Sequence, residues 1–274
     1  MSKISDKLNI ISSAKNDIKT AIENKGVSVG DIGIQEYASK IDEMQVATPP
    51  AKGFIVNEFD ADGYPTDISI VGMTSIPDYY FQSSFGSNLF KNIKSNSNLH
   101  LPNDLKSIGK SAFYQCSNLA LTELPDSITK IDSKAFQYCG NLALTKLPDN
   151  LTTLNQYAFR GCSKITINEI PAGVDVLNSY VFYDCSGLRT ITCLGPVRYV
   201  YQDFCISCKW VGKFILPNIT SVPTLTGYPL FPNSYIESGT GYIYVPDALV
   251  DSFKTATNWS TYAAQIKGIS ELEG

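Results

Sequence analysis

Histidine is almost absent from this chain of 274 residues: His100 is the one histidine, beside three methionines and two tryptophans. A metal site built from several histidines is therefore excluded, and any Ser-His or Cys-His mechanism would have to pass through His100. Ser97 and Asp104 are so near it in sequence that they need no catalytic explanation. We expect His100 to be a surface or edge residue of a strand.

Long apolar runs and an excess of basic charge are lacking as well. No run of about 18 apolar residues occurs, and residues 1–7 lack the apolar core of a secretory signal, so membrane insertion is not expected. Lys and Arg number 22 against 26 Asp and Glu, which leaves no basic stripe for nucleic acid. With 43% hydrophobic residues, the chain is expected to form one or two globular domains kept in the cytosol, with release by lysis if it acts outside a cell.

What the sequence does contain is a repeat with a period of 23 residues. A proline preceded by Leu or Ile, a phenylalanine preceded by Ala or Val, and a cysteine all recur at this step. Their positions are Pro102, Pro125, Pro148, Pro171; Phe113, Phe136, Phe159, Phe182; and Cys116, Cys139, Cys162, Cys185, Cys208. One unit is too small to bury its own apolar edge, so the units are predicted to stack into a solenoid with a continuous core.

Each unit is predicted to contribute one strand, at residues 142–147 in the central copy, because this segment is short and apolar and ends at Pro148, which cannot donate to a ladder. Side chains that point outward beside these strands are free to vary, and tyrosine rings suit recognition at low entropic cost. The candidate binding surface comprises Glu123, Lys146, Glu169, Thr192, Tyr114, Tyr138 and Tyr183. The tyrosines could instead cover the edges of the coils.

The units share a consensus order of markers: a cysteine with a leucine three places later, Leu-Pro, two isoleucines, Ala-Phe and the next cysteine. Over residues 68–215 this order of markers resembles the BspA-type leucine-rich repeat family. The resemblance implies an α+β protein in which a leucine-rich repeat solenoid is the main domain. The coils at its two ends are degenerate: Ile76 and Phe90 stand in for markers before it, and after it Phe204 comes one place early with Cys205 in the phenylalanine slot. Terminal coils of a solenoid need such departures, since they must offer water a polar outer face.

Five of the seven cysteines occupy the repeat position and are predicted to be small core residues with free thiols. Equivalent side chains of stacked coils project in parallel, so a disulfide between coils is not favoured. Cys205 and Cys208 form a CxxC that would suit a redox pair or half a zinc site, but the repeat register explains both as core residues. No metal and no cofactor are expected.

Residues 1–48 are predicted to form a helical attachment and oligomerisation module. Apolar side chains and one lysine alternate in steps of four and three, the seam of a coiled coil: Ile4, Leu8, Ile11, Lys15, Ile18 and Ile22. Either these helices fold back on one another or cap the solenoid, or the seam joins copies of the chain, with a trimer favoured. Residues 14–41 resemble the amino-terminal module of some bacteriophage tail-fibre and head-fibre proteins, which implies attachment to a virion.

Two further regions flank the repeats. Residues 49–67 are predicted to be a linker and a hairpin that turns at Asp62 and Gly63; a calcium loop starting at Asp60 is the alternative, although it lacks its distal ligands. Residues 216–274 are predicted to be a helical cap, with one helix opened by Pro246 and another starting near Asn258 with Ser260 as its cap. Trp259, Tyr262 and Ile266 would close the core, or Trp259 would stack on a ligand.

Together the two resemblances imply a bacteriophage virion protein, a tail or head fibre, that presents the solenoid to a protein or glycan of the host surface. It is expected to be non-enzymatic and to have copies of itself and other virion proteins as partners. The alternatives are a purely structural virion component and a BspA-like adhesin on the bacterial cell surface. A depolymerase with paired carboxylates in a groove is a less favoured possibility.

Overall fold

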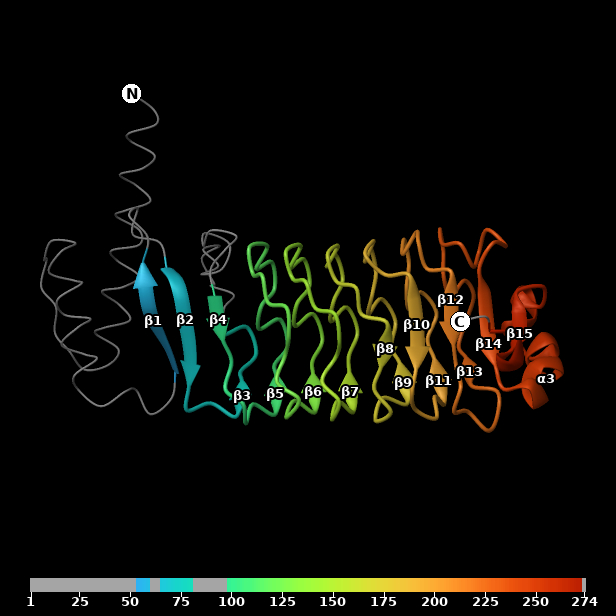
Figure 1. Ribbon diagram of the computed structural model, residues 1–274, viewed down its shortest axis with the longest axis horizontal. Coiled ribbons are helices and arrows are strands. Elements are labelled where there is room, and N and C mark those ends of the chain that lie inside the picture. Colours follow the sequence, from blue (N-terminus) through green and yellow to red (C-terminus); the bar gives the residue numbers. More distant parts are fainter. Residues whose placement is uncertain (1–52, 60–64, 81–97, 273–274) are drawn as a thin grey trace, which may run out of the picture. The chain divides into compact units, whose positions relative to one another are not determined.

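The computed structural model describes residues 53–59, 65–80 and 98–272 (Figure 1). The chain divides into two compact units, Met1–Ala51 and Lys52–Gly274, and all described residues belong to the second. The predicted helical module of residues 1–48, with its seam from Ile4 to Ile22, therefore lies outside the described residues.

An antiparallel hairpin opens the described part of the chain. Strand β1 (Gly53–Phe59) pairs with β2 (Pro65–Val71), as the sequence predicts around Asp62 and Gly63, while the turn itself and Asp60 lie outside the described residues. Ile68 and Ile70 of β2 are buried. Strand β2 also pairs in parallel with β4 (Asn98–His100), so the hairpin leads into the stack of coils.

Each following coil contributes a two-residue parallel strand. These strands are β3 (Ser75–Ile76), β5 (Ser107–Ile108), β6 (Lys130–Ile131), β7 (Thr153–Leu154), β9 (Val176–Leu177), β11 (Tyr199–Val200) and β13 (Thr224–Leu225). They form two parallel ladders, β3-β5-β6-β7 and β9-β11-β13. In every one the second residue is buried and the first lies nearer solvent, as the two-residue period of a strand requires.

The strand predicted at residues 142–147 is wrong. This segment makes only isolated bonds between coils, such as Ala143 N to Leu121 O at 2.9 Å, and the strand of this coil is β7, after Pro148. Leu142, Leu144 and Leu147 are all buried. The step of three between the last two breaks the alternation that a strand needs.

Later coils do form strands at that place in the repeat. A five-stranded parallel sheet runs β8-β10-β12-β14-β15, with bounds β8 (Glu169–Ile170), β10 (Thr190–Cys193), β12 (Lys213–Ile215), β14 (Tyr242–Val245) and β15 (Ile266–Gly268). In β10 the buried residues Ile191 and Cys193 alternate with less buried neighbours, as a strand requires.

The core is built from columns of equivalent side chains, as the repeat predicts. Phe113, Phe136, Phe159 and Phe182 are fully buried and stack with ring centroids 5.1, 5.5 and 5.9 Å apart and at most 8° between their planes. Phe204, displaced by one place in the sequence, breaks this pattern and meets Phe182 edge to face at 82°. The phenylalanine column therefore changes its geometry where the repeat becomes degenerate.

The repeated cysteines form a second column beside the first. Three of these thiols donate to the backbone of the preceding coil: Cys139 Sγ lies 3.0 Å from Phe113 O, Cys162 Sγ lies 3.1 Å from Phe136 O, and Cys185 Sγ lies 3.1 Å from Phe159 O. Cys116, Cys139, Cys162, Cys185 and Cys193 are buried, with their sulfur atoms as thiols. Burial raises the pKa of the Cys162 thiol, because a thiolate would lose its hydration there.

One cysteine prediction needs correction, because Cys205 and Cys208 form a disulfide. Cys208 is one of the five repeat cysteines predicted to be free thiols, but parallel side chains disfavour a bridge only between equivalent residues of neighbouring coils. These two cysteines instead lie within one coil, with Cα atoms 5.7 Å apart, a distance that a disulfide spans.

The carboxyl-terminal region continues the parallel sheet and contains little helix. After β14 come η2 (Asp247–Leu249), α3 (Val250–Thr255), η3 (Trp259–Tyr262), β15 and η4 (Ile269–Glu271). Pro246 precedes the first helical turn as predicted. The second predicted helix is wrong: η3 is a 3₁₀ turn of four residues, and Asn258, not Ser260, stands before it without a capping bond. No helix in the described ranges is long and apolar enough to cross a membrane.

Three aromatic or apolar side chains fill the core at this end. Trp259, Tyr262 and Ile266 are buried, and Trp259 Nε1 donates to Pro223 O at 2.8 Å. The Tyr262 hydroxyl accepts a bond from Leu230 N at 2.8 Å, and burial raises the pKa of Tyr262 to about 12. Trp259 therefore has no exposed ring face on which a ligand could stack.

Candidate functional site

Two positions of every coil have a left-handed backbone, and both recur every 23 residues. The first position is occupied by Ser111, Lys134, Tyr157, Tyr180 and Asp203. The second is occupied by Gln115, Tyr138, Gly161, Asp184 and Ser207. At most of these residues the backbone N–H donates to the next coil: Lys134 N lies 3.1 Å from Gln156 O, and Tyr138 N lies 2.7 Å from Arg160 O. Left-handed backbone costs a non-glycine residue about 1–2 kcal/mol, which these bonds between coils offset.

The side chains along this edge form a row of rings and cations, here called the tyrosine–cation strip. It consists of Tyr79, Lys110, Tyr114, Lys134, Tyr138, Tyr157, Arg160, Tyr180 and Tyr183. Tyr157 and Tyr180 stack with centroids 4.8 Å apart and 2° between their planes. Tyr114 and Tyr138 meet edge to face at 6.0 Å. The strip therefore joins successive coils through direct ring contacts.

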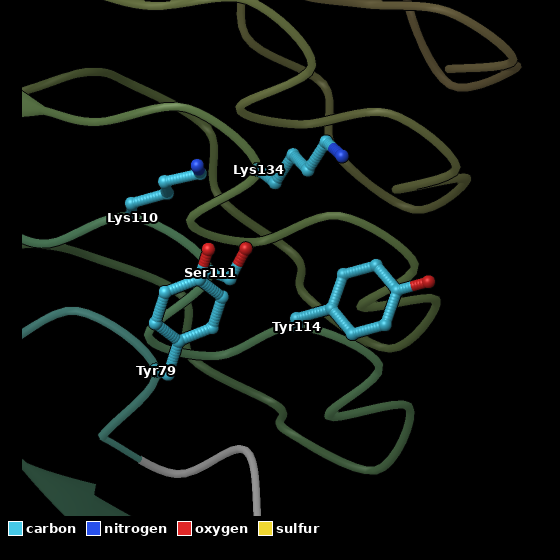
Figure 2. Close-up of a pocket in the computed structure, with 5 residues that line it drawn as sticks. All are labelled: Tyr79, Lys110, Ser111, Tyr114 and Lys134. Atoms are coloured by element: carbon cyan, nitrogen blue, oxygen red, sulfur yellow. The ribbon is translucent and has the colours of Figure 1, made fainter.

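One end of the strip is hollowed into an open pocket of about 260 Å³. It is lined by Tyr79, Lys110, Ser111, Tyr114 and Lys134 (Figure 2). In Figure 2 the two lysine side chains lie along one side of the pocket and the two tyrosine rings along the other. The Tyr79 ring is 47% exposed, and Lys110 Nζ lies 5.8 Å from its centroid. The pocket thus combines flat ring surfaces with two ammonium groups.

Arg160 lies in the middle of the strip among three tyrosine rings. Its guanidinium carbon is 4.5 Å from the Tyr183 centroid, 5.3 Å from that of Tyr138 and 5.8 Å from that of Tyr157. These are distances at which a cation is attracted to a ring face. The Arg160 Nε atom is buried and has no hydrogen-bond partner among the described residues.

Among the described residues, no carboxylate forms an ion pair with a cation of the strip, whereas Tyr180 bonds a carboxylate. Within the described ranges, no carboxylate forms an ion pair with the side chain of Lys110, Lys134 or Arg160. By contrast, the Tyr180 hydroxyl donates to Asp203 Oδ2 at 3.0 Å, and this hydrogen bond raises the pKa of Tyr180. At the end of the strip that holds the pocket, the Asp78 carboxylate accepts a bond from the Lys110 backbone N–H at 2.7 Å, and the lysine ammonium groups form no ion pair with the described residues.

The surface predicted from sequence divides into two sets. Glu123, Lys146 and Glu169 are exposed, and Thr192 lies directly opposite Glu169 in the parallel sheet, as predicted for outward positions. Lys146 forms an ion pair with Asp126 at 3.1 Å, and the equivalent residues of the neighbouring coils, Glu123 and Glu169, are acidic. This row of side chains therefore carries charges of both signs. The predicted tyrosines, Tyr114, Tyr138 and Tyr183, belong to the strip instead.

Sequence reasoning missed the remaining members of the strip. Tyr157 and Tyr180 are one period apart and could have been found from the repeat. Lys110, Lys134 and Arg160 could not, because they occupy different places of the repeat and meet the rings only in the folded coil.

His100 is an exposed residue of β4, as expected, and its Nε2 atom lies 2.9 Å from Asp67 Oδ2. The Asn57 side chain, which also bonds Asp67, is the larger cause of a lowered Asp67 pKa, and His100 is the second. Over the described residues, no three His, Cys, Asp or Glu side chains gather closely enough to hold a metal ion.

Three solved structures are similar to this chain at low identity. A leucine-rich repeat protein from Bacteroides ovatus is 22% identical with a TM-score of 0.44, over 64% of this chain and 44% of that chain. The T. pallidum leucine-rich repeat protein is 20% identical with a TM-score of 0.34, over 80% of this chain and 97% of that one. A leucine-rich cell surface protein from Faecalibacterium prausnitzii is 16% identical with a TM-score of 0.35, over 81% of this chain and 93% of that chain.

The chain thus spans less than half of the Bacteroides ovatus protein. No curated protein matches it. The family of the BspA type leucine-rich repeat region matches in six copies over residues 83–211. The match covers the coils in which the phenylalanine and cysteine columns lie, and it agrees with the resemblance of the sequence frame. Residues 83–211 of this chain are therefore similar to a BspA-type leucine-rich repeat region.

Proposed function

We propose that this protein is a non-enzymatic recognition protein that binds its partner through the outer surface of the coils. The observation that carries the proposal is the tyrosine–cation strip. Left-handed backbone positions bonded to the next coil hold several of its side chains, including Lys134, Tyr138 and Tyr180. Rings that are ordered before binding lose little entropy when a partner arrives, so a rigid row of this kind favours affinity.

The setting that we propose is a bacteriophage virion, in which the protein is a tail or head fibre component that recognises the host surface. The support is the resemblance of residues 14–41 to the amino-terminal modules of such fibres, a segment outside the described residues. The second candidate is an adhesin on the bacterial cell surface, and the BspA-type match of residues 83–211 favours it. Both settings use the same binding surface, so location and binding are tested separately.

Binding is tested with the fluorescently labelled full-length protein on a panel of intact bacterial cells. We expect the protein to label cells of particular strains and the double variant Lys134→Gln/Tyr138→Asn to lose most of this labelling. Tyr199→Thr is the matched control, because Tyr199 is 43% exposed but lies outside the strip. Equal labelling by wild type and the double variant would show that recognition uses another surface.

Location is tested with an antibody against the solenoid on purified phage particles and on bacterial envelope fractions. Label on particles supports the fibre proposal, and label confined to envelopes supports the adhesin. Particles that carry the protein, together with the lack of labelling of any cell, would indicate a purely structural virion component that contacts other virion proteins.

A further inference from the structure

We infer that the tyrosine–cation strip binds an acidic glycan, a sugar polymer that carries carboxylate or sulfate groups. The inference rests on the proposed recognition function and names the chemical class of its ligand. Three features carry it: the exposed tyrosine rings, the cations that form no ion pair within the described residues, and the shape of the pocket.

The exposed rings of this surface are suited to sugars. All large hydrophobic side chains that are exposed in the described part of the chain are tyrosines, and Tyr79 and Tyr138 of the strip are among them, at 47% and 38% exposure. A ring face carries partial negative charge and packs against the C–H face of a sugar, while the phenol hydroxyl can bond sugar hydroxyls. The apolar centre that marks a protein–protein interface is absent from the described part of the strip.

The cations select for negative charge on that ligand. Lys110, Lys134 and Arg160 come from three successive coils, which are spaced at about 4.8 Å per strand, and none is paired with a carboxylate of the described residues. The formal net charge of the whole chain is −4, so long-range attraction does not favour polyanions of any kind, and the local contacts of the strip decide the choice. A sugar chain with anionic groups engages both the rings and the short row of cations.

The pocket fixes how such a polymer lies. Its volume of about 260 Å³ falls just below the range of sites for drug-sized molecules, and it is open rather than enclosed. One sugar unit therefore sits among Tyr79, Tyr114 and the two lysines, and the chain continues over Tyr138 toward Arg160. The ligand runs along the stack, from coil to coil.

The test measures binding of the full-length protein by biolayer interferometry to four immobilised probes. These are polygalacturonate and dextran sulfate, which carry carboxylate and sulfate, neutral dextran, and oligo(dT). We expect both acidic glycans to bind, with affinity that falls as salt is raised, and neutral dextran to bind at least about tenfold more weakly, the change that one charge-assisted contact produces. Binding to one acidic glycan alone identifies which anionic group the strip prefers.

Two matched pairs of variants locate the site. Lys110→Gln/Lys134→Gln removes two charges while keeping most of each stem, and Lys164→Gln/Lys254→Gln removes two charges elsewhere. Tyr79→Asn/Tyr138→Asn removes two rings with a residue that tolerates left-handed backbone, and Tyr199→Thr removes an exposed ring outside the strip. We expect each strip variant to bind polygalacturonate or dextran sulfate about tenfold more weakly and each control to bind as wild type.

Two results would overturn the inference: binding of oligo(dT) as tight as that of the glycans, or equal losses for strip and control variants. Absence of binding to both acidic glycans overturns it as well. That last result leaves the recognition function intact if whole cells are still labelled and the strip variant still loses the labelling, since the partner is then a surface protein. Circular dichroism of each variant excludes loss of folding as the cause.

Discussion

The rings of Phe136 and Phe159 lie 5.5 Å apart with 3° between their planes. The two residues are one period apart, and both side chains are fully buried. Each ring fills the layer of its own coil and forms the floor of the next layer. Removal of one ring therefore weakens the packing of the coils on both sides, as expected for a stack in which each unit contacts only its neighbours.

Truncation of a central ring should destabilise the solenoid strongly. We expect Phe159→Ala to lower the free energy of unfolding by about 3–5 kcal/mol, because it leaves a cavity between Phe136 and Phe182. Phe159→Leu keeps more of the volume and should lose clearly less. Urea unfolding followed by circular dichroism measures both. Equal losses for the two variants would contradict a close-packed column.

A methyl group at Gly187 should be much more harmful than one at Gly140. A Cβ atom at Gly187 would lie 2.1 Å from the Ile165 carbonyl oxygen of the preceding coil, whereas at Gly140 it would meet nothing within 4 Å. Since that oxygen belongs to the backbone, the coils would have to separate. We expect Gly187→Ala to lower the thermal midpoint and Gly140→Ala to leave it unchanged or raise it, by about 0.4–1 kcal/mol in stability. Similar midpoints would show that the coils are less closely apposed.

The columns of the core could be predicted because the period itself determines them. Once units of equal length stack, Phe136 must lie over Phe113 and Cys139 over Cys116, whatever the local backbone does. The place of the strand could not be predicted in the same way. Residues 142–147 have the composition of a strand, but the burial of Leu144 and Leu147 decides that the chain bends there.

The strip was only partly predictable, for a different reason. The left-handed position that it uses is filled by Ser111, Lys134, Tyr157 and Tyr180, which share no side-chain chemistry. The requirement is on the backbone, and the bond to the next coil makes several residue types acceptable. A sequence pattern based on residue type therefore misses this position. The tyrosines found from sequence, Tyr114, Tyr138 and Tyr183, each stand next to a phenylalanine or cysteine of the repeat.

The thiol column should be inert in the folded protein. Burial raises the pKa of Cys139, Cys162 and Cys185, so almost no thiolate is available for reaction. We expect iodoacetamide at pH 8 to leave the native protein unmodified and to label five thiols in urea, with two more after reduction of the disulfide. Rapid labelling of the native protein would contradict the buried column.

The same pKa shifts predict a loss of stability in alkali. The pKa of an ordinary cysteine thiol is 9.0, and burial raises the pKa of these thiols in the folded protein, so above about pH 9 the unfolded chain releases protons that the folded chain retains. Stability should be constant below that pH and fall above it. The thermal midpoint measured from pH 7 to pH 10 checks this, and Cys162→Ala, which removes one titrating group, should show a shallower fall. An identical slope in this variant would exclude Cys162 as a contributor.

The seam of residues 1–48 predicts association, and this remains a prediction because the segment lies outside the described residues. If Ile4, Leu8, Ile11, Lys15, Ile18 and Ile22 form a shared coiled-coil core, light scattering of the full chain should give three times its mass of 30.0 kDa. Ile18→Asp places a charge in that core and should yield monomers. Asn16→Asp adds the same charge off the seam and should remain a trimer. A wild-type monomer would instead favour helices that fold back on one another, since an apolar seam covered within its own chain leaves nothing for a second copy to bury.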